Sequence, residues 1–155
     1  MPTPCAEWNV RHLVNHVVRG NLNYVALLKG GTAEEFRRRR DVDALRGEPV
    51  SAFRESVRGF VVAFRGAAER DLDYPLGKIG VAQAVRVRTA DTVIHTWDLA
   101  RAIGVDDKLD AELVAWIDEN LEGIYAGMAG LDGFFATSER AGSSRQVRLL
   151  RRMGR

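Results

Sequence analysis

The sequence contains little that would place it in a membrane or an oxidising compartment. Cys5 is the single cysteine among 155 residues, so an intramolecular disulfide is excluded. No apolar run approaches the roughly 20 residues of a membrane-spanning helix, and no basic segment followed by an apolar one opens the chain. We therefore expect a cytoplasmic protein that does not bind membranes.

The chain also lacks an excess of charge of one sign. Its 23 Lys and Arg residues nearly balance its 21 Asp and Glu residues, which leaves a net charge of +2. General electrostatic attraction to nucleic acid is therefore not expected. The basic residues gather at 37–40 and in the last eleven positions, 145–155. A solvated helix face and a basic tail explain them, and contact with an anionic ligand is the alternative.

Strand patterns are scarce, and 130–137 is the one weak candidate for an extended segment. A hydrophobic content of 46% and a charged content of 28% fit one soluble domain over 1–155. Apolar residues recur at spacings of three and four, which predicts an all-α bundle. The expected helices are 10–28, 33–40, 51–68, 80–103, 111–124 and 144–152, with a loop at 71–80 and an irregular Gly-rich segment from 129 up to the last, basic helix. The expected caps are Asn9, Ser51 and Asp110 at N-termini and Gly104 at a C-terminus.

Histidine is scarce as well, and one of the three histidines lies in an unusual setting. On the helix expected at 80–103, Asp91, His95 and Asp98 share one face that is otherwise largely apolar. Burying such groups costs several kcal/mol unless they are paired or bind a metal. Asp91 and His95 are four residues apart, so their side chains converge. A structural hydrogen bond and a pair of metal ligands are both consistent with this spacing.

A third ligand would have to come from another helix. His16 lies at the edge of an apolar stripe, near Gly20, where there is room for a cation. His12 is four residues earlier and is farther from the stripe, which favours a surface position. Asp98 fits better as a hydrogen-bond partner of a ligand than as a ligand. Two imidazoles and one carboxylate suit zinc, nickel, iron or manganese and leave coordination positions open.

Three segments resemble a known family. TPCAEWNVRHLVNHVVRGN at 3–21 and RTADTVIHTWDLARAIG at 88–104 resemble the DinB-like metal-binding four-helix bundles. They are most similar to the actinobacterial branch grouped with the mycothiol-dependent maleylpyruvate isomerases, and RLLRRMGR at 148–155 resembles the C-terminal end of that branch. The resemblance implies that His16, Asp91 and His95 hold one divalent metal ion, commonly zinc.

The sequence departs from the family pattern in several places. The family has an additional helix before the TPC-type segment, so we expect a bundle that lacks this first helix and exposes apolar surface, which a homodimer would cover. Asp91 stands where the isomerases have glutamate, and His12 stands where an acidic residue is usual. The isomerases also carry a C-terminal sterol-carrier-like domain, for which the chain has no room.

The resemblance implies an enzyme that uses a small thiol, mycothiol in this family, as cosubstrate. A metal-activated thiolate would attack a small electrophile in an isomerisation or an S-transfer. Arg88 or the C-terminal arginines would steer an anionic substrate, while no catalytic residue is assigned. The alternatives are a hydrolase that uses a metal-activated water, with Asp98 or His12 as base, and a non-catalytic metal-binding module that acts through association.

Overall fold

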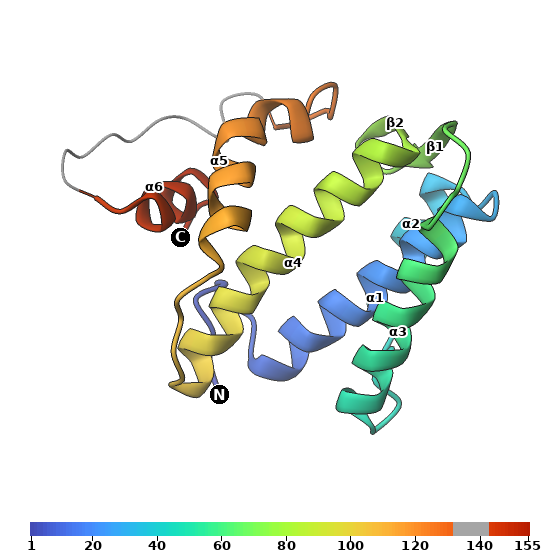
Figure 1. Ribbon diagram of the computed structural model, residues 1–155. Helices are drawn as coiled ribbons and strands as arrows, with labels where there is room; N and C mark the ends of the chain where they lie inside the picture. The colour runs from blue at the N-terminus through green and yellow to red at the C-terminus, as the bar shows by residue number, and fades with distance from the viewer. Residues whose placement is uncertain (132–142) are drawn as a thin grey trace.

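The computed structural model describes residues 1–131 and 143–155. Helices dominate the described residues, which confirms the all-α prediction (Figure 1). The elements in chain order are α1 (Val10–Leu28), α2 (Ala33–Arg38), α3 (Pro49–Phe64), β1 (Asp71–Tyr74), β2 (Gly77–Gly80), α4 (Val81–Ile103), α5 (Ala111–Ile124) and α6 (Arg145–Arg152). Within that part of the chain, no helix is both long enough and apolar enough to cross a bilayer.

The long helices pack around α1 and α4. Helix α1 contacts both α3 and α4, α5 lies along α4, and α6 packs on α5 (Figure 1). The core is built from apolar side chains that all of these layers contribute, and the most buried include Leu13, Val18, Leu72, Ile79, Ala84, Ala90, Ile117, Leu121, Ile124 and Leu149. The interface between α1 and α4 is where the histidines of the two helices meet.

Most of the predicted helix ends are confirmed by their hydrogen bonds. The Asn9 side chain accepts a bond from the backbone N–H of His12, and Asp110 caps α5 in the same way. Gly104 ends α4 in the left-handed conformation, with φ 71°. Ser51 was the wrong cap for α3, because this helix begins two residues earlier at Pro49 and the Ser51 hydroxyl bonds to Glu55 instead. Proline at a first helical position has its φ already fixed for the helix, which favours the earlier start.

Two further boundaries differ from the prediction. Helix α3 ends at Phe64 rather than near 68, and Gly66 follows with φ 73°. Helix α2 stops at Arg38 instead of 40. The weak prediction of an extended segment at 130–137 falls almost wholly on 132–142, outside the described residues.

The expected loop at 71–80 is wrong, because this segment forms an antiparallel hairpin. Tyr74 pairs with Gly77 across a two-residue turn, and Leu72 pairs with Ile79. The Leu72 and Ile79 side chains are each only 2% exposed, since the hairpin packs between α1 and α4. Strands of four residues are too short to give a clear alternating pattern, and this hairpin is stabilised by its burial on the helices.

Residues before α1 fold back along the end of α4. An isolated bridge joins Pro2 to Asn9, and the Thr3 N–H donates to the Trp8 carbonyl at 3.1 Å. This N-terminal loop places Cys5 and Trp8 against α4, where the two side chains form one side of the candidate site.

Candidate metal centre

The three predicted ligands come together between α1 and α4. His16 Nε2 lies 3.4 Å from Asp91 Oδ1, and His95 Nε2 lies 3.4 Å from the same oxygen. One ligand atom from each of the three side chains lies within 4.8 Å of the others. The structure therefore forms the cluster that the spacing of Asp91 and His95 and the family resemblance predicted.

The spacing of these atoms fits a small divalent cation. Metal–nitrogen and metal–oxygen bonds of about 2.0–2.2 Å at tetrahedral angles put neighbouring ligand atoms roughly 3.3–3.5 Å apart. Both of the measured 3.4 Å separations fall in this interval. Three protein ligands also leave a coordination position for a substrate or water.

His95 is held so that its Nε2 faces the cluster. Its other ring nitrogen, Nδ1, lies 2.8 Å from Asp98 Oδ2, and the Asp98 side chain is fully buried. A carboxylate on the far nitrogen of an imidazole fixes the ring orientation and raises its basicity as a ligand. This is the supporting role that the sequence suggested for Asp98.

Asp98 is itself held by the two ends of the chain. The Arg155 guanidinium donates to both Asp98 oxygens, at 2.7 and 3.0 Å, and the Cys5 thiol donates to Oδ2 at 3.1 Å. Burial and the contact with Asp98 together raise the pKa of the Cys5 thiol to about 11, although the charge of Arg155 opposes them. Burial opposes ionisation of Asp98, but its bonds with His95, Arg155 and Cys5 outweigh burial and lower its pKa to about 2.

The two central side chains of the cluster stabilise each other's charge. Loss of hydration opposes the charged form of Asp91, yet hydrogen bonds from His16 and His95 and the charge of Arg88 hold its pKa well below the usual range. Burial disfavours the charged form of His95, but Asp91 and Asp98 outweigh it and raise the pKa of His95 to about 9. The cluster thus holds the ionised Asp91 carboxylate between the imidazoles of His16 and His95.

The Trp8 indole packs against both imidazoles of the cluster. Its ring centroid lies 4.8 Å from that of His16 and 5.8 Å from that of His95. The indole limits the side-chain freedom of both imidazoles, which keeps their Nε2 atoms near Asp91. The sequence suggested Arg155 only as one of the C-terminal arginines that would steer a substrate and Trp8 only as a core or pocket-wall aromatic. It gave Cys5 no role in the site, although Cys5 and Trp8 lie in the first family-like segment.

Arg88, predicted as a substrate-binding residue, lies buried behind Asp91. Its guanidinium donates to Asp91 Oδ2, to Asn21 Oδ1 at 2.7 Å and to the Val17 carbonyl at 2.7 Å. These bonds engage all three guanidinium nitrogens with protein partners. Arg88 therefore positions the Asp91 carboxylate, with Oδ1 left facing the imidazoles.

His12 and Gly20 occupy different places from the ligands. His12 is exposed on the first turn of α1, outside the ligand cluster. Gly20 leaves space for a side chain rather than for a cation, because a Cβ at this position would lie 2.9 Å from the Arg88 Cζ and Nη1 atoms. The missing side chain lets the guanidinium rest against α1.

Replacing Gly20 by alanine should therefore disturb the metal centre by displacing Arg88, which holds the Asp91 carboxylate. The new methyl group would force the Arg88 guanidinium away from partners that it holds with three bonds, so we expect Gly20→Ala to lower the free energy of unfolding by about 1–3 kcal/mol. Gly59→Ala in α3 is the matched control, since its Cβ would meet nothing within 4 Å. This control should stabilise the helix by about 0.5–1 kcal/mol. Urea denaturation measures both, and equal effects of the two substitutions would contradict the packing role of Gly20.

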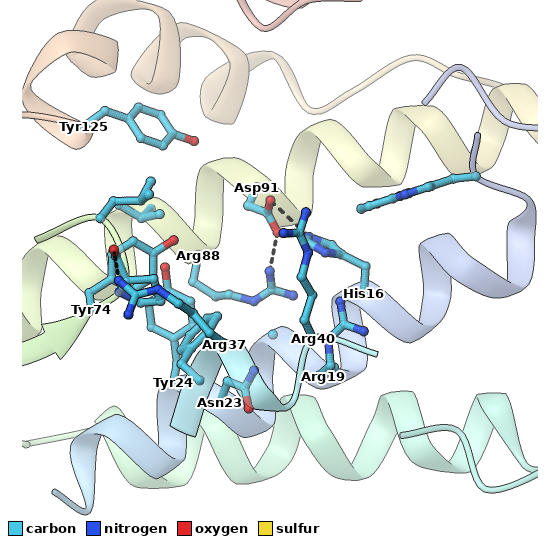
Figure 2. Close-up of a pocket in the computed structure, with 16 residues that line it drawn as sticks. His16, Arg19, Asn23, Tyr24, Arg37, Arg40, Tyr74, Arg88, Asp91 and Tyr125 are labelled. Atoms are coloured by element: carbon cyan, nitrogen blue, oxygen red, sulfur yellow. Dashed lines mark hydrogen bonds and ion pairs between the residues drawn. The ribbon is translucent and has the colours of Figure 1, made fainter. Parts of the chain in front are cut away.

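Two cavities reach His16, and a third, of about 630 Å³ between α1, α3 and α4, reaches His95. The first, of about 360 Å³, is lined by His16, Arg88 and Asp91 together with aromatic side chains and further arginines (Figure 2). The second, of about 440 Å³, shares Trp8, His16, Arg19 and Arg40 with the first and is otherwise polar. Its remaining lining residues are Glu7, His12, Asn15 and Asp41. The cluster is thus bordered by cavities with different linings.

Comparison of the sequence with known proteins identifies the family that it matches. Residues 1–100 match the family described as the mycothiol maleylpyruvate isomerase N-terminal domain. Two proteins of Mycobacterium tuberculosis, from strains CDC 1551 and H37Rv, are each 32% identical over 112 residues, and both are described as uncharacterized. The aligned region covers 72% of this chain and 58% of each relative's length. No solved structure matches the chain significantly.

Proposed function

The chain belongs to the mycothiol maleylpyruvate isomerase N-terminal domain family, and from this premise we propose that it holds one divalent metal ion and uses it to activate a small thiol. The proposed ligands are His16, Asp91 and His95, with zinc as the preferred ion and mycothiol as the thiol. The observation that carries the proposal is the convergence of these three ligand atoms, each from a residue that lines a cavity. The reaction is an isomerisation or S-transfer on a small electrophile.

A bound divalent cation would supply Lewis acidity, which lowers the pKa of a thiol in contact with it. His16, Asp91 and His95 would hold the ion. Asp98 and Trp8 keep the imidazoles aligned, and Arg88 fixes the carboxylate. These contacts mean that little reorganisation is needed when the ion enters, which favours both binding and catalysis.

The reaction itself is balanced without an external oxidant or reductant. The thiol loses its S–H proton to solvent, and the sulfur electron pair forms a C–S bond with the electrophilic carbon. In an addition to a conjugated C=C bond, the π pair of that bond moves onto the carbonyl oxygen, and it returns when the C–S bond breaks. In an isomerisation the same C–S bond later breaks, the carbon skeleton leaves in its new geometry and the thiol recovers a proton. In an S-transfer the C–S bond remains, and a leaving group departs with its bonding electrons.

Hydrolysis is less well supported by the same residues. Asp98 was one of two side chains considered as a general base, and its oxygens are occupied by His95, Arg155 and Cys5. His12, the other one, is exposed on the first turn of α1 and belongs to no ligand group among the described residues. A thiol nucleophile has no need of such a base, because its proton is lost on activation. A reduced thiol cosubstrate and the unpaired Cys5 both fit the cytoplasm, which we propose as the location.

The proposal is tested with the untagged protein loaded with zinc or cobalt. Mycothiol added to the cobalt form should give a thiolate-to-cobalt charge-transfer band in the near ultraviolet. The zinc form should accelerate addition of mycothiol to maleylpyruvate or to a general electrophile such as chlorodinitrobenzene, and Asp91→Asn should lose both signals. Absence of the band together with absence of acceleration in the fully loaded protein would overturn thiol activation and favour the non-catalytic alternative.

A further inference from the structure

The cavity between α1, α3 and α4 has no role in the proposed chemistry, although His95 contributes to its lining. It is about 630 Å³ in volume, within the usual range of small-molecule sites. Helix α1 packs against both α3 and α4 and lies between them, so it forms the floor and the other two helices form the walls (Figure 1). The lining runs from Val10 to Val17 on α1 and from Thr92 to Leu99 on α4, about 10 Å along each helix.

The interior of this cavity offers a guest almost no polar contact. The hydroxyls of Thr92 and Thr96 donate to backbone carbonyls one turn earlier on α4, both at 2.8 Å. The ring nitrogens of His95 are engaged by Asp91 and Asp98. A polar group that entered would lose its water without gaining a partner, so the inserted part of a guest must be apolar. The apolar lining residues are Val10, Leu13, Val14, Val17, Leu45, Pro49, Val50, Phe53 and Leu99.

The α3 wall of the cavity presents apolar surface to solvent. Val50 is 63% exposed and Phe53 is 39% exposed, although both line the cavity. Helix α3 packs chiefly on α1, so within the described part of the chain no further helix covers this wall. Covering it with an apolar chain is favourable in proportion to the area removed from water.

The charges at the edge of the cavity indicate which head group a guest would carry. Arg11 and Arg54 line the cavity from α1 and α3, both side chains are exposed, and no acidic residue belongs to the described lining. Arg11 is paired with Asp43 at 2.7 Å. Arg54 makes no side-chain hydrogen bond and no ion pair among the described residues. An anionic group beside Arg54 would therefore be complementary in charge and would stay hydrated.

The limits of the apolar lining favour a flexible chain over a docked helix. At one end, Leu45 from the loop before α3 is 1% exposed and meets the cavity. At the other end, the next turn of α1 after Val17 carries Asn21, whose amide donates to the Ser56 hydroxyl at 3.1 Å. A helix long enough to be stable, at least ~12 residues, would extend beyond both limits, whereas an aliphatic chain can end within them.

We propose that this cavity binds a single-chain anionic amphiphile, a free medium-chain fatty acid, whose aliphatic chain lies between α1, α3 and α4 and whose carboxylate lies beside Arg54. This site is separate from the proposed thiol chemistry and needs no metal. The aliphatic chain would contact His95, so its binding would change the surroundings of one proposed metal ligand.

Calorimetry with octanoate, decanoate and dodecanoate, each below its critical micelle concentration, tests the site. The protein is treated with a chelator so that direct binding of a carboxylate to zinc cannot produce the signal. Affinity should rise about tenfold for every two methylene groups added, or ~1.4 kcal/mol, until the cavity is filled. Decyltrimethylammonium, with a chain of the same length and the opposite charge, should bind at least about tenfold more weakly than decanoate. Absence of the chain-length dependence, or equal binding of the two head groups, would overturn the proposal.

Matched variants identify the place of binding. Arg54→Gln should weaken decanoate binding about three- to fivefold, whereas Arg58→Gln, exposed one turn later and outside the lining, should not. Thr96→Phe places a ring in the cavity from an exposed position and should weaken binding at least about tenfold. Val62→Phe, which adds a ring at an exposed position outside the cavity, is its control. Melting temperatures check that all four variants fold, and equal effects within either pair would contradict the assigned site.

A second copy of the chain is the competing occupant, and sedimentation equilibrium of the same samples detects it. A parent dimer that Thr96→Phe converts to a monomer, together with no binding of decanoate, would assign the cavity to that second copy and refute the fatty-acid site. The result is separable from that of the proposed function. Because decanoate binding is measured without metal, it can succeed or fail whatever zinc and mycothiol do.

Discussion

Replacing His95 by alanine is expected to abolish stoichiometric binding of zinc. His95 Nε2 lies 3.4 Å from Asp91 Oδ1, and His95 is the one ligand whose orientation is fixed by a buried carboxylate. Its removal leaves two ligands that cannot enclose a cation. Elemental analysis of untagged protein purified with added zinc should give close to one ion per chain for the parent and less than about a tenth of that for His95→Ala.

His12→Ala is the matched control for this substitution. His12 is exposed on the first turn of α1 and belongs to no ligand cluster among the described residues, so its removal should leave the zinc content unchanged. A second measurement separates loss of metal from loss of fold. Zinc at about 100 times its dissociation constant should stabilise the parent and His12→Ala by about 2.7 kcal/mol, and His95→Ala not at all. If His95→Ala retained full zinc, the ion would have to bind elsewhere and the assigned centre would be wrong.

Replacing Asp98 by asparagine is expected to have the largest effect on stability. The buried Asp98 carboxylate accepts bonds from His95, Arg155 and Cys5, and the Arg155 side chain is only 17% exposed. Removing one partner of a buried ion pair leaves the other charge uncompensated, which costs about 3–5 kcal/mol. Because His95 also loses the group that orients it, zinc affinity should fall about 10–100-fold.

Asp107→Asn controls for the loss of one carboxylate. Asp107 pairs with Arg101 at 3.3 Å near the surface, where the Arg101 side chain is exposed and the Asp107 side chain is partly exposed. Such pairs contribute about 0–1 kcal/mol, so this variant should unfold almost as the parent does and keep its zinc affinity. Urea denaturation of the metal-free proteins and competition with a chromophoric chelator measure the two quantities. Equal behaviour of Asp98→Asn and Asp107→Asn would show that the buried network does not support the centre.

The sequence was sufficient for the features that depend on local spacing. Helices α1, α4 and α5 follow from apolar positions three and four apart. The caps of α1 and α5 follow from side chains that bond to nearby backbone groups, and the end of α4 follows from Gly104. The pairing of Asp91 with His95 is of the same kind, because residues four apart on a helix face each other whatever surrounds them. The family resemblance added His16, and the structure brings it to the same carboxylate.

Other features depend on contacts between distant segments, which no local pattern reports. The hairpin at 71–80 is stabilised by burial of Leu72 and Ile79 on helices that lie on either side of it in the sequence. The role of Arg88 could not be read from its position, because its partners at Val17 and Asn21 lie on another helix. The same holds for Gly20, whose missing side chain matters only because Arg88 rests against it.

The metal centre combines both kinds of information. The sequence by itself determined a helical protein in which Asp91 and His95 converge on one face, since helix geometry fixes that relation over a single turn. Only the tertiary structure decided what surrounds this pair. It placed Arg155 against Asp98 and Trp8 over both imidazoles, and it gathered the cavity arginines from α1 and from α2 and the residues after it. The physical reason is that burial and charge compensation depend on which segments pack together, and packing is a property of the whole chain.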